Sequence, residues 1–377
     1  MATRFLTYVQ SPLAGPPFDQ PERLELDLSF RVRPGPSDDQ VYVLDAIKRR
    51  YPNTPGAHVY DRAGGRPWGG AKHPPVEPGP DGHFDHLVPG TRPFAAASVY
   101  ATVRFVLGLW DAYFADVGGE PVEWHHRPQP GVDGRLELNP WSLQDGARAG
   151  YGFVEIGTGI RGGQFNHSGP LWSNFDVIAH ELGHSIVFGK MKFPANMTLN
   201  TEWYSVKNKT NNRDFLAFHE SCGDLVAIVS SLHHRKVVNY LLANAGDNLA
   251  AANIVSNVGE LGKRSSIRYA SNGRKMSEFG GNPADTDVHA LSEVLTGAVY
   301  AAAVDAYRDA RRKKSAAVAV GHARDWLGRV LAGTWSQLSP DGLTFLKVRD
   351  AMIEADAALK GNMEKALVAQ FRSRGIS

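Results

Sequence analysis

One buried helix constrains this chain more than any other feature of its sequence. The segment NFDVIAHELGHSIVFGK, residues 174–190, places His180 and His184 four residues apart, so both point to one face of a helix. Apolar residues flank the histidines and also fill the opposite side, and a helix that is apolar on both sides is buried. The fold must therefore bury two imidazoles and the carboxylate of Glu181, which is costly unless a partner satisfies them.

A metal ion would satisfy these side chains directly. Neutral imidazole nitrogens are natural ligands of Zn²⁺, at about 2.0–2.1 Å. Glu181 lies about 60° around the helix from His184, so its carboxylate can border the same cleft. In a His-Glu-x-x-His helix the histidines bind zinc and the glutamate acts as general base. The segment therefore predicts one catalytic Zn²⁺ bound by His180 and His184, with Glu181 as a catalytic residue.

A third ligand is expected downstream of this helix. The positions three and six residues after His184 are Val187 and Lys190, which excludes the metzincin pattern of a glycine and a third histidine. A carboxylate is then the expected ligand, and Glu202 and Glu220 are the two near candidates.

Glu220 is the favoured third ligand. It lies in FLAFHESCGDLVAIVSSL, 215–232, an apolar helical pattern that Asp214 can cap, whereas the surroundings of Glu202 show no helical pattern. Asp224 follows Glu220 by one turn on the same face. From there it can accept the second N–H of a ligating histidine and so fix the histidine's tautomer.

The composition is ordinary for a globular protein and points to no charged partner. Hydrophobic residues make up 42% of the 377 residues, charged residues 21%, and the formal net charge is +2. So small a charge gives no reason to expect binding to nucleic acid or to an anionic membrane. The most apolar segment, 94–110, contains Arg104 and is interpreted as a core helix, so we expect no membrane span.

The N-terminus and the cysteine content bear on the compartment. The first residues lack the apolar stretch of a signal peptide, and Cys222 is the only cysteine, so no internal disulfide can form. We therefore expect a soluble, cytoplasmic protein. Cys222 is interpreted as a buried small side chain and His219 as a wall of the cleft. His233 and His234 are interpreted as surface cations at a helix end.

The changes in composition and hydrophobic periodicity along the chain predict an α+β fold with two catalytic lobes. Residues 1–92 are rich in proline and glycine with some strands, 93–189 form a strand-rich lobe ending in the His-Glu-x-x-His helix, and 190–377 form a helical lobe. The periodicity predicts strands at 23–32, 121–126, 135–139 and 151–157, and helices at 97–118, 174–189, 215–232, 289–312 and 345–370.

Three blocks of sequence resemble the thermolysin-like gluzincin neutral metallopeptidases. These are DVIAHELGH (176–184), ESCGD (220–224) and DVHALSEVLTGAVY (287–300), within a region from about 97 to 305. The resemblance implies a zinc endopeptidase that acts on peptides or proteins. It also implies that His289 stabilises the oxyanion. A weaker block, SSIRYASN (265–272), is similar to a family segment whose arginine binds a substrate carbonyl, a role it implies for Arg268.

The residues before His289 support its role independently of the family. His289 follows Asp285 and Asp287 and opens a long helical pattern. A nearby carboxylate would hold its imidazole in the tautomer that donates a hydrogen bond.

The chain also departs from the family. The spacer between His184 and Glu220 is longer than in thermolysin, which predicts an inserted loop at about 190–213 bordering the cleft. The region after the third-ligand helix reads IVSSLHHRKVV, without the acids that bind calcium in the family, so calcium is an open question. If no calcium binds, the charge of Asp176 would instead interact favourably with the positive end of the helix dipole. The family is usually secreted with a signal and a pro-region, and neither is evident here.

Two alternatives remain beside the endopeptidase. One is an exopeptidase on the same scaffold, which needs an acidic residue to bind the substrate α-amine. The other is a catalytically silent or latent zinc-binding scaffold, against which the intact Glu181 argues. The sequence leaves the oligomeric state open.

Overall fold

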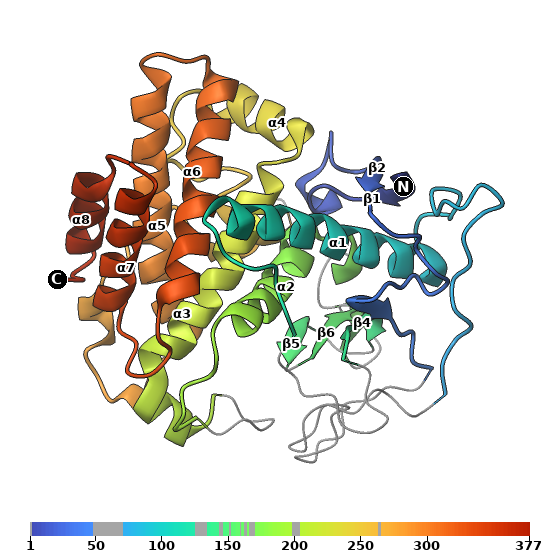
Figure 1. The fold of residues 1–377 in the computed structure, drawn as a ribbon, viewed down its shortest axis with the longest axis horizontal. Helices are drawn as coiled ribbons and strands as arrows, with labels where there is room; N and C mark the ends of the chain where they lie inside the picture. The colour runs from blue at the N-terminus through green and yellow to red at the C-terminus, as the bar shows by residue number, and fades with distance from the viewer. Residues whose placement is uncertain are drawn as a thin grey trace. The chain divides into compact units, whose positions relative to one another are not determined.

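The computed structural model of the chain has the predicted α+β architecture, with most strands in its N-terminal half and most helices in its C-terminal half (Figure 1). It describes residues 2–47, 71–124, 134–142, 146–150, 152–158, 160–161, 164–165, 170–197, 204–262 and 265–377. The chain forms two compact units: residues 1–107, 124–185 and 259–266 in the first, and 108–123, 186–258 and 267–377 in the second. The division at 92 and 189 stays a prediction.

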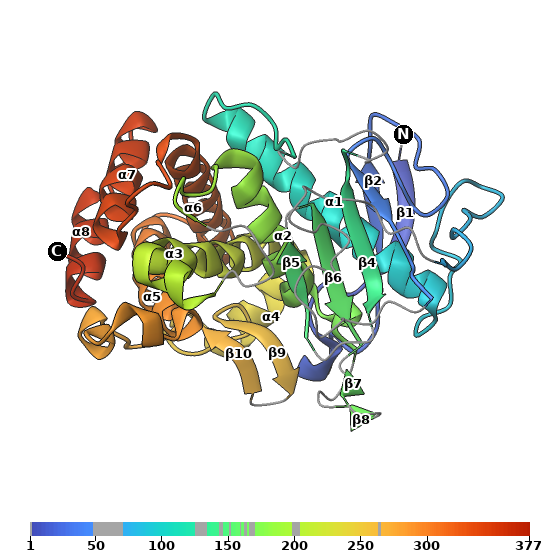
Figure 2. The ribbon, with the colours of Figure 1, turned by 90° about the horizontal axis from the view of Figure 1, so that it is seen from below.

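A four-stranded sheet is the centre of the first unit. Its strand order is β3-β4-β6-β5, in which β3, β4 and β6 run parallel and β5 is antiparallel (Figure 2). Nearly every residue of β4 and β6 is buried, as expected of parallel strands that are covered on both faces. The strands are β3 (Val41–Val43), β4 (Leu136–Ser142), β5 (Arg148–Gly150) and β6 (Phe153–Gly157).

Three two-stranded sheets complete the strands of the described residues. The first pairs β1 with β2 and brings Phe5 into a stack with Phe84 in the core. The predicted strand 23–32 is shorter in the structure, and residues 121–124 of the predicted strand 121–126 form none, while 125–126 lie outside the described residues. These strands are β1 (Ala2–Thr7), β2 (Glu22–Asp27), β7 (Ile160–Arg161), β8 (Gln164–Phe165), β9 (Asn257–Gly262) and β10 (Ser265–Tyr269).

The long apolar helix α1 (Arg92–Asp116) is a core helix. It ends where Gly118 adopts a φ of 74°, a conformation that favours glycine. Among the described residues α1 is long and apolar enough to cross a membrane, but 78% of its most apolar window is buried. Helices α3 (Val206–Ser231) and α4 (Arg235–Ala245) are long and apolar enough only when taken together, and the pair is bent by 95°.

Packed helices make up most of the second unit. Helix α3 packs against α5, α5 against α6 and α8, and α6 against α7 (Figure 1). Helices α4 and α6 were not predicted. The helices are α2 (Phe175–Lys190), α3 (Val206–Ser231), α4 (Arg235–Ala245), α5 (Val288–Arg311), α6 (Ala316–Gln337), α7 (Phe345–Ala358) and α8 (Glu364–Ser373).

Two helix ends differ from the prediction. Helix α3 starts nine residues before the predicted 215, because the side chain of Ser205 accepts a hydrogen bond from the backbone N–H of Asn208. Asp214 is therefore inside the helix and does not cap it. Two residues before Asp214, the backbone of Asn212 is non-helical, with φ −137° and ψ 31°.

The predicted helix 345–370 is two helices, because the chain turns sharply after α7. Asp356 is buried and accepts hydrogen bonds from the Trp326 indole N–H and the Met363 backbone N–H, both at 2.8 Å. Lys360 has a φ of 56°, and a Cβ on Gly361 would lie 1.8 Å from the Asp356 carboxylate. Only glycine fits there, so the turn is built around the buried carboxylate.

His233 and His234 are not surface cations, contrary to the prediction. Burial, with Arg324 close by, lowers the pKa of His233 to about 4, and burial lowers the pKa of His234 to about 3. Both imidazoles are therefore neutral near pH 7. The Tyr113 hydroxyl lies 2.8 Å from the His233 Nε2 and donates to Asp325 at 3.0 Å. The four side chains that meet here are called the His233 cluster: Tyr113, His233, Arg324 and Asp325.

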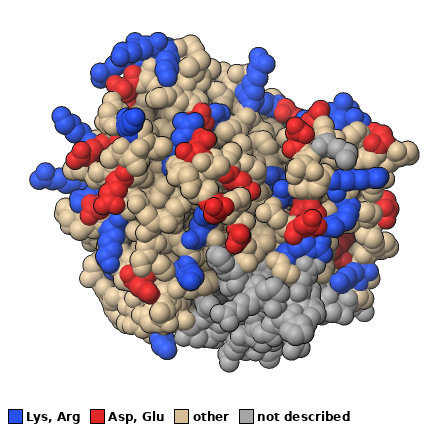
Figure 3. All heavy atoms as spheres, in the orientation of Figure 1, with Lys and Arg blue, Asp and Glu red and all other residues tan. Residues whose placement is uncertain are grey.

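Charged side chains of both signs are interspersed on the face drawn in Figure 3. This distribution agrees with the small net charge of the chain. The predicted absence of a nucleic-acid partner stays a prediction.

Candidate metal centre

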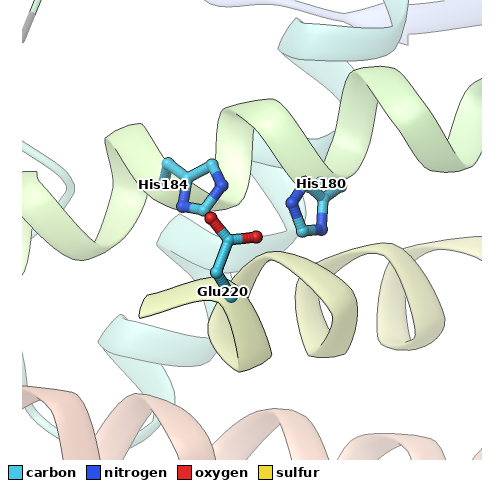
Figure 4. A group of neighbouring side chains, drawn as sticks. All are labelled: His180, His184 and Glu220. Carbon is cyan, nitrogen blue, oxygen red and sulfur yellow. The ribbon is translucent and has the colours of Figure 1, made fainter. Parts of the chain in front are cut away.

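The structure brings together the three side chains that the sequence predicts as metal ligands. His180 and His184 project from α2 toward Glu220 on α3 (Figure 4). All three side chains are buried, and one ligand atom from each lies within 4.8 Å of the others. The two imidazole rings are perpendicular, with centroids 4.7 Å apart. The three residues could therefore hold one metal ion.

The sequence of α2 explains why its histidines are fixed in place. Asn174 precedes the helix, and its side-chain oxygen accepts a hydrogen bond from the backbone N–H of Val177 at 3.3 Å. Asp176 lies in the first turn and Lys190 in the last, where their charges interact favourably with the helix dipole. The side opposite the histidines packs into the core through three side chains with at most 1% exposure: Ile178, Leu182 and Ile186.

The donor set fits zinc better than a hard cation. Two imidazole nitrogens and one carboxylate oxygen are the protein ligands of several catalytic zinc sites, whereas Ca²⁺ takes six to eight oxygens. Glu181 directly follows His180 on the same helix and is 9% exposed, and it is not one of the three residues whose ligand atoms converge.

Polar side chains surround the Glu220 carboxylate. The Tyr204 hydroxyl donates a hydrogen bond to Oε1, the Arg268 Nη2 lies 3.0 Å from Oε2, and the His289 Nε2 lies 3.6 Å from Oε1. Together with Asp224, these residues are called the Glu220 cluster: Tyr204, Glu220, Asp224, Arg268 and His289. The carboxylate is thus oriented from several sides.

Arg268 links Glu220 to Asp224. Its Nε lies 2.7 Å from Asp224 Oδ1, and the side chain of Thr296 donates to Asp224 Oδ2 at 3.3 Å. Burial alone would lower the pKa of Arg268, but the carboxylates of Asp224 and Glu220 outweigh it and raise that pKa above its usual value. Arg268 is therefore a fixed cation. Its predicted contact with a substrate carbonyl, and the contact of Asp224 with a ligating histidine, stay predictions.

His289 opens α5, as the sequence predicts, and keeps access to solvent. The Asp287 side chain caps the helix by accepting the backbone N–H of His289 at 3.0 Å, and its Oδ1 lies 3.5 Å from the His289 Nδ1. The His289 side chain is 49% exposed. Asp285, the other predicted partner, accepts a hydrogen bond from Asn282. The carboxylate beside the imidazole is thus that of Asp287.

Comparison with known proteins shows the fold of the chain. A precursor of protealysin, a metalloproteinase from Serratia proteamaculans, is similar in structure with a TM-score of 0.50 over 82% of this chain and 83% of that chain. The two sequences are 12% identical, so the likeness extends to the fold alone. No protein-family model matches the sequence, and no curated protein does.

Tyr204 contacts the site, although no pattern in the sequence indicated it. Its ring centroid lies 5.2 Å from that of His289, and the residue is 40% exposed. The stretch TLNTEWYSV has no periodicity that would place Tyr204 near Glu220. The alternative ligand Glu202 and part of the predicted insert, 198–203, lie outside the described residues.

The remaining candidates near the site are structural. His219 is buried and stacks on Phe188, with ring centroids 4.1 Å apart, so it packs the core. Cys222 is buried, and burial raises the pKa of its thiol well above the usual value, which makes the thiolate inaccessible.

Proposed function

We propose that this chain is a zinc-dependent metalloendopeptidase that hydrolyses internal peptide bonds. The observation that carries the proposal is the convergence of His180, His184 and Glu220, with ligand atoms within 4.8 Å, next to a carboxylate on the same helix. Two histidines and one glutamate leave a fourth position of a tetrahedral zinc open, as catalysis requires. The fold shared with a metalloproteinase agrees with this proposal.

Glu181 moves the proton in the proposed reaction. When bound, the zinc acts as a Lewis acid and lowers the pKa of water at the site. Glu181 accepts a proton from the attacking water and later gives it to the leaving amine. Its position one residue after His180, with 9% exposure, keeps this carboxylate next to the ligands and largely shielded from solvent.

His289 and Tyr204 are the donors in the Glu220 cluster that a substrate can reach. They are 49% and 40% exposed, by side chain and by residue respectively, and each contacts the Glu220 carboxylate. A substrate oxygen that develops negative charge near this carboxylate lies within reach of both. Such donors are commonly worth about 2.7–4 kcal/mol each. We assign them to oxyanion stabilisation, and we assign the buried Arg268 to the orientation of the Glu220 carboxylate.

The first test pairs metal analysis with a peptide-digest assay on the wild type and on Glu181→Gln. We expect one zinc per chain in both proteins, cleavage inside peptides by the wild type, and a loss of kcat of at least about 1,000-fold in the variant, because the base is removed while the ligands stay. Glu364→Gln, which changes an exposed glutamate of α8, serves as the control and should keep full activity.

The same digest separates the alternatives. Stepwise release of terminal residues, instead of internal fragments, would identify an exopeptidase. Zinc in both proteins with cleavage by neither would identify a silent or latent scaffold. Near-full activity of Glu181→Gln would contradict the proposed mechanism.

A further inference from the structure

The far end of the chain contacts the loop that follows β10, the strand that carries Arg268. Arg374 follows α8 and is 8% exposed, and its guanidinium donates three hydrogen bonds. Nη1 lies 2.6 Å from the Asn272 side-chain oxygen and 3.1 Å from the Arg274 carbonyl, and Nη2 lies 2.6 Å from the Asn272 carbonyl. Burial lowers the pKa of Arg374, because its guanidinium has lost most of its contact with water. The hydrogen bonds to the loop compensate for this desolvation.

Asn272 transmits this contact to the end of β10. Its Nδ2 donates to the carbonyl of Tyr269 at 2.6 Å and to the carbonyl of Glu293 at 2.9 Å. Its side-chain oxygen also accepts the backbone N–H of Arg274 at 3.0 Å. Every polar atom of this side chain is therefore engaged, and Arg374 contacts a residue that joins β10 to α5.

Glu293 holds the same peptide from the other side. Its Oε1 accepts the backbone N–H of Tyr269 at 2.9 Å, and its Oε2 lies 2.5 Å from the Arg274 Nε. Both polar groups of the Tyr269 backbone are thus bound by side chains, and Tyr269 directly follows Arg268. Glu293 also lies one helical turn after His289 on the same face of α5, so it ties the strand of Arg268 to the helix of His289.

Gly297 leaves the space that Arg374 needs. A Cβ at this position would lie 2.7 Å from the Arg374 Nη1 and 2.9 Å from the Asn272 Nδ2, closer than carbon approaches such atoms. The guanidinium can cross α5 only because this residue has no side chain, although glycine inside a helix costs about 1 kcal/mol relative to alanine.

We infer that Arg374, Asn272 and Glu293 form a clamp that positions Arg268 against Glu220 and Asp224, and so orients the ligand carboxylate. All three are positioning residues, since they act on the site through Arg268 and its strand. The inference rests on the proposed function for its effect on zinc, while the geometry of the clamp can be tested without it.

The test is a zinc competition titration with a chromophoric chelator, run on Arg374→Ala in the wild-type and Arg268→Ala backgrounds. Loss of a residue that orients a ligand typically weakens metal binding 10–100-fold, so we expect about tenfold for Arg268→Ala. Arg374→Ala should cost about fivefold in the wild-type background and less than twofold without Arg268, because coupled residues are not additive. An equal loss in both backgrounds, or no loss, would overturn the inference.

Two further variants separate positioning from folding. Gly297→Ala should raise helix stability and still weaken zinc binding, since it displaces the guanidinium; unchanged zinc affinity would count against the clamp. Arg372→Ala, an exposed arginine two residues before Arg374, is the matched control and should change nothing.

Hydrogen exchange at the Tyr269 amide gives a readout that needs no metal. Exchange should be at least about tenfold faster in Arg374→Ala and in Gly297→Ala than in the wild type and in Arg372→Ala, because the clamp no longer holds the peptide. If the wild type binds no zinc, the proposed function fails, and the hydrogen-exchange rate of the Tyr269 amide alone decides whether the clamp exists. An unchanged rate would then overturn the clamp, and a faster one would support it.

Discussion

Two polar clusters in the second unit hold the same kinds of side chain and differ in what surrounds them. The Glu220 cluster contains a tyrosine, a histidine, an arginine and acids, and so does the His233 cluster. In both, the arginine is paired with a carboxylate, Arg268 with Asp224 at 2.7 Å and Arg324 with Asp325 at 2.8 Å. Residue types alone therefore do not distinguish a reactive site from a structural one.

Solvent access and metal donors make the difference. In the Glu220 cluster His289 is half-exposed, and two further imidazoles lie within 4.8 Å of the carboxylate. In the His233 cluster Tyr113 is 5% exposed, and burial lowers the pKa of His233 to about 4. The first cluster can meet a substrate, whereas the second joins α1 to α6 and the end of α3.

The largest expected contrast is between the two histidines. His289→Ala should lower kcat/KM on a peptide about 100–1,000-fold with zinc content unchanged, because it removes the proposed oxyanion donor. His233→Ala should lower thermal stability and keep kcat/KM within about threefold. Steady-state kinetics and thermal unfolding of both variants check this. Similar kinetic losses in the two proteins would erase the distinction.

Acidification should destabilise the fold through the neighbouring imidazoles of His233 and His234. Because the folded-state pKa of His233 is lowered from 6.5 to about 4, the unfolded chain binds the proton first. The stabilising contribution is complete above about pH 6.5 and is lost as pH falls toward 4, by on the order of 3 kcal/mol. Urea unfolding between pH 7 and 4 should show this decline, and His233→Gln should make it shallower, with the buried His234 accounting for the part that remains. A variant that declines as steeply as the wild type would contradict the assignment.

The two tyrosines should give the smallest contrast. Tyr204→Phe should lower kcat/KM about tenfold at unchanged stability, since it removes a half-exposed donor. Tyr113→Phe should cost about 1 kcal/mol of stability, because its hydroxyl joins His233 to Asp325, and leave kcat/KM unchanged. Matched kinetics and denaturation of the pair measure both effects. The reverse pattern would mean that the clusters have been assigned the wrong way round.

The sequence predicted those parts of the fold and site in which a local pattern coincides with a physical need. Helix α2 could be read because its apolar periodicity and its ligand spacing agree, and α5 because Asp287 caps a long apolar pattern. Glu220 could be preferred because the segment around it, 215–232, has an apolar helical pattern. The roles assigned to these residues remain to be measured.

The features that were missed depend on contacts distant in sequence. Tyr204 reaches Glu220 only through the path of the chain before α3, and the Asp356 carboxylate that separates α7 from α8 is bound by Trp326, thirty residues earlier. His233 and His234 follow a helix end, where exposure is the default, and burial in the folded chain lowers their pKa values, with Arg324 of α6 also lowering that of His233. Periodicity contains no information of this kind.

The turn built around Asp356 has a mechanical consequence for the C-terminal arginine. Helix α8 is a rod of ten residues, about 15 Å long, whose start is fixed by the hydrogen bond from Met363 to Asp356 and whose end presents Arg374. A tilt of about 10° at the start would move the far end by roughly 2.6 Å over that length. Hydrogen bonds at 2.6 Å do not tolerate such a displacement. Asp356 therefore fixes the orientation of α8 at its start, and so determines where the Arg374 guanidinium lies at its other end.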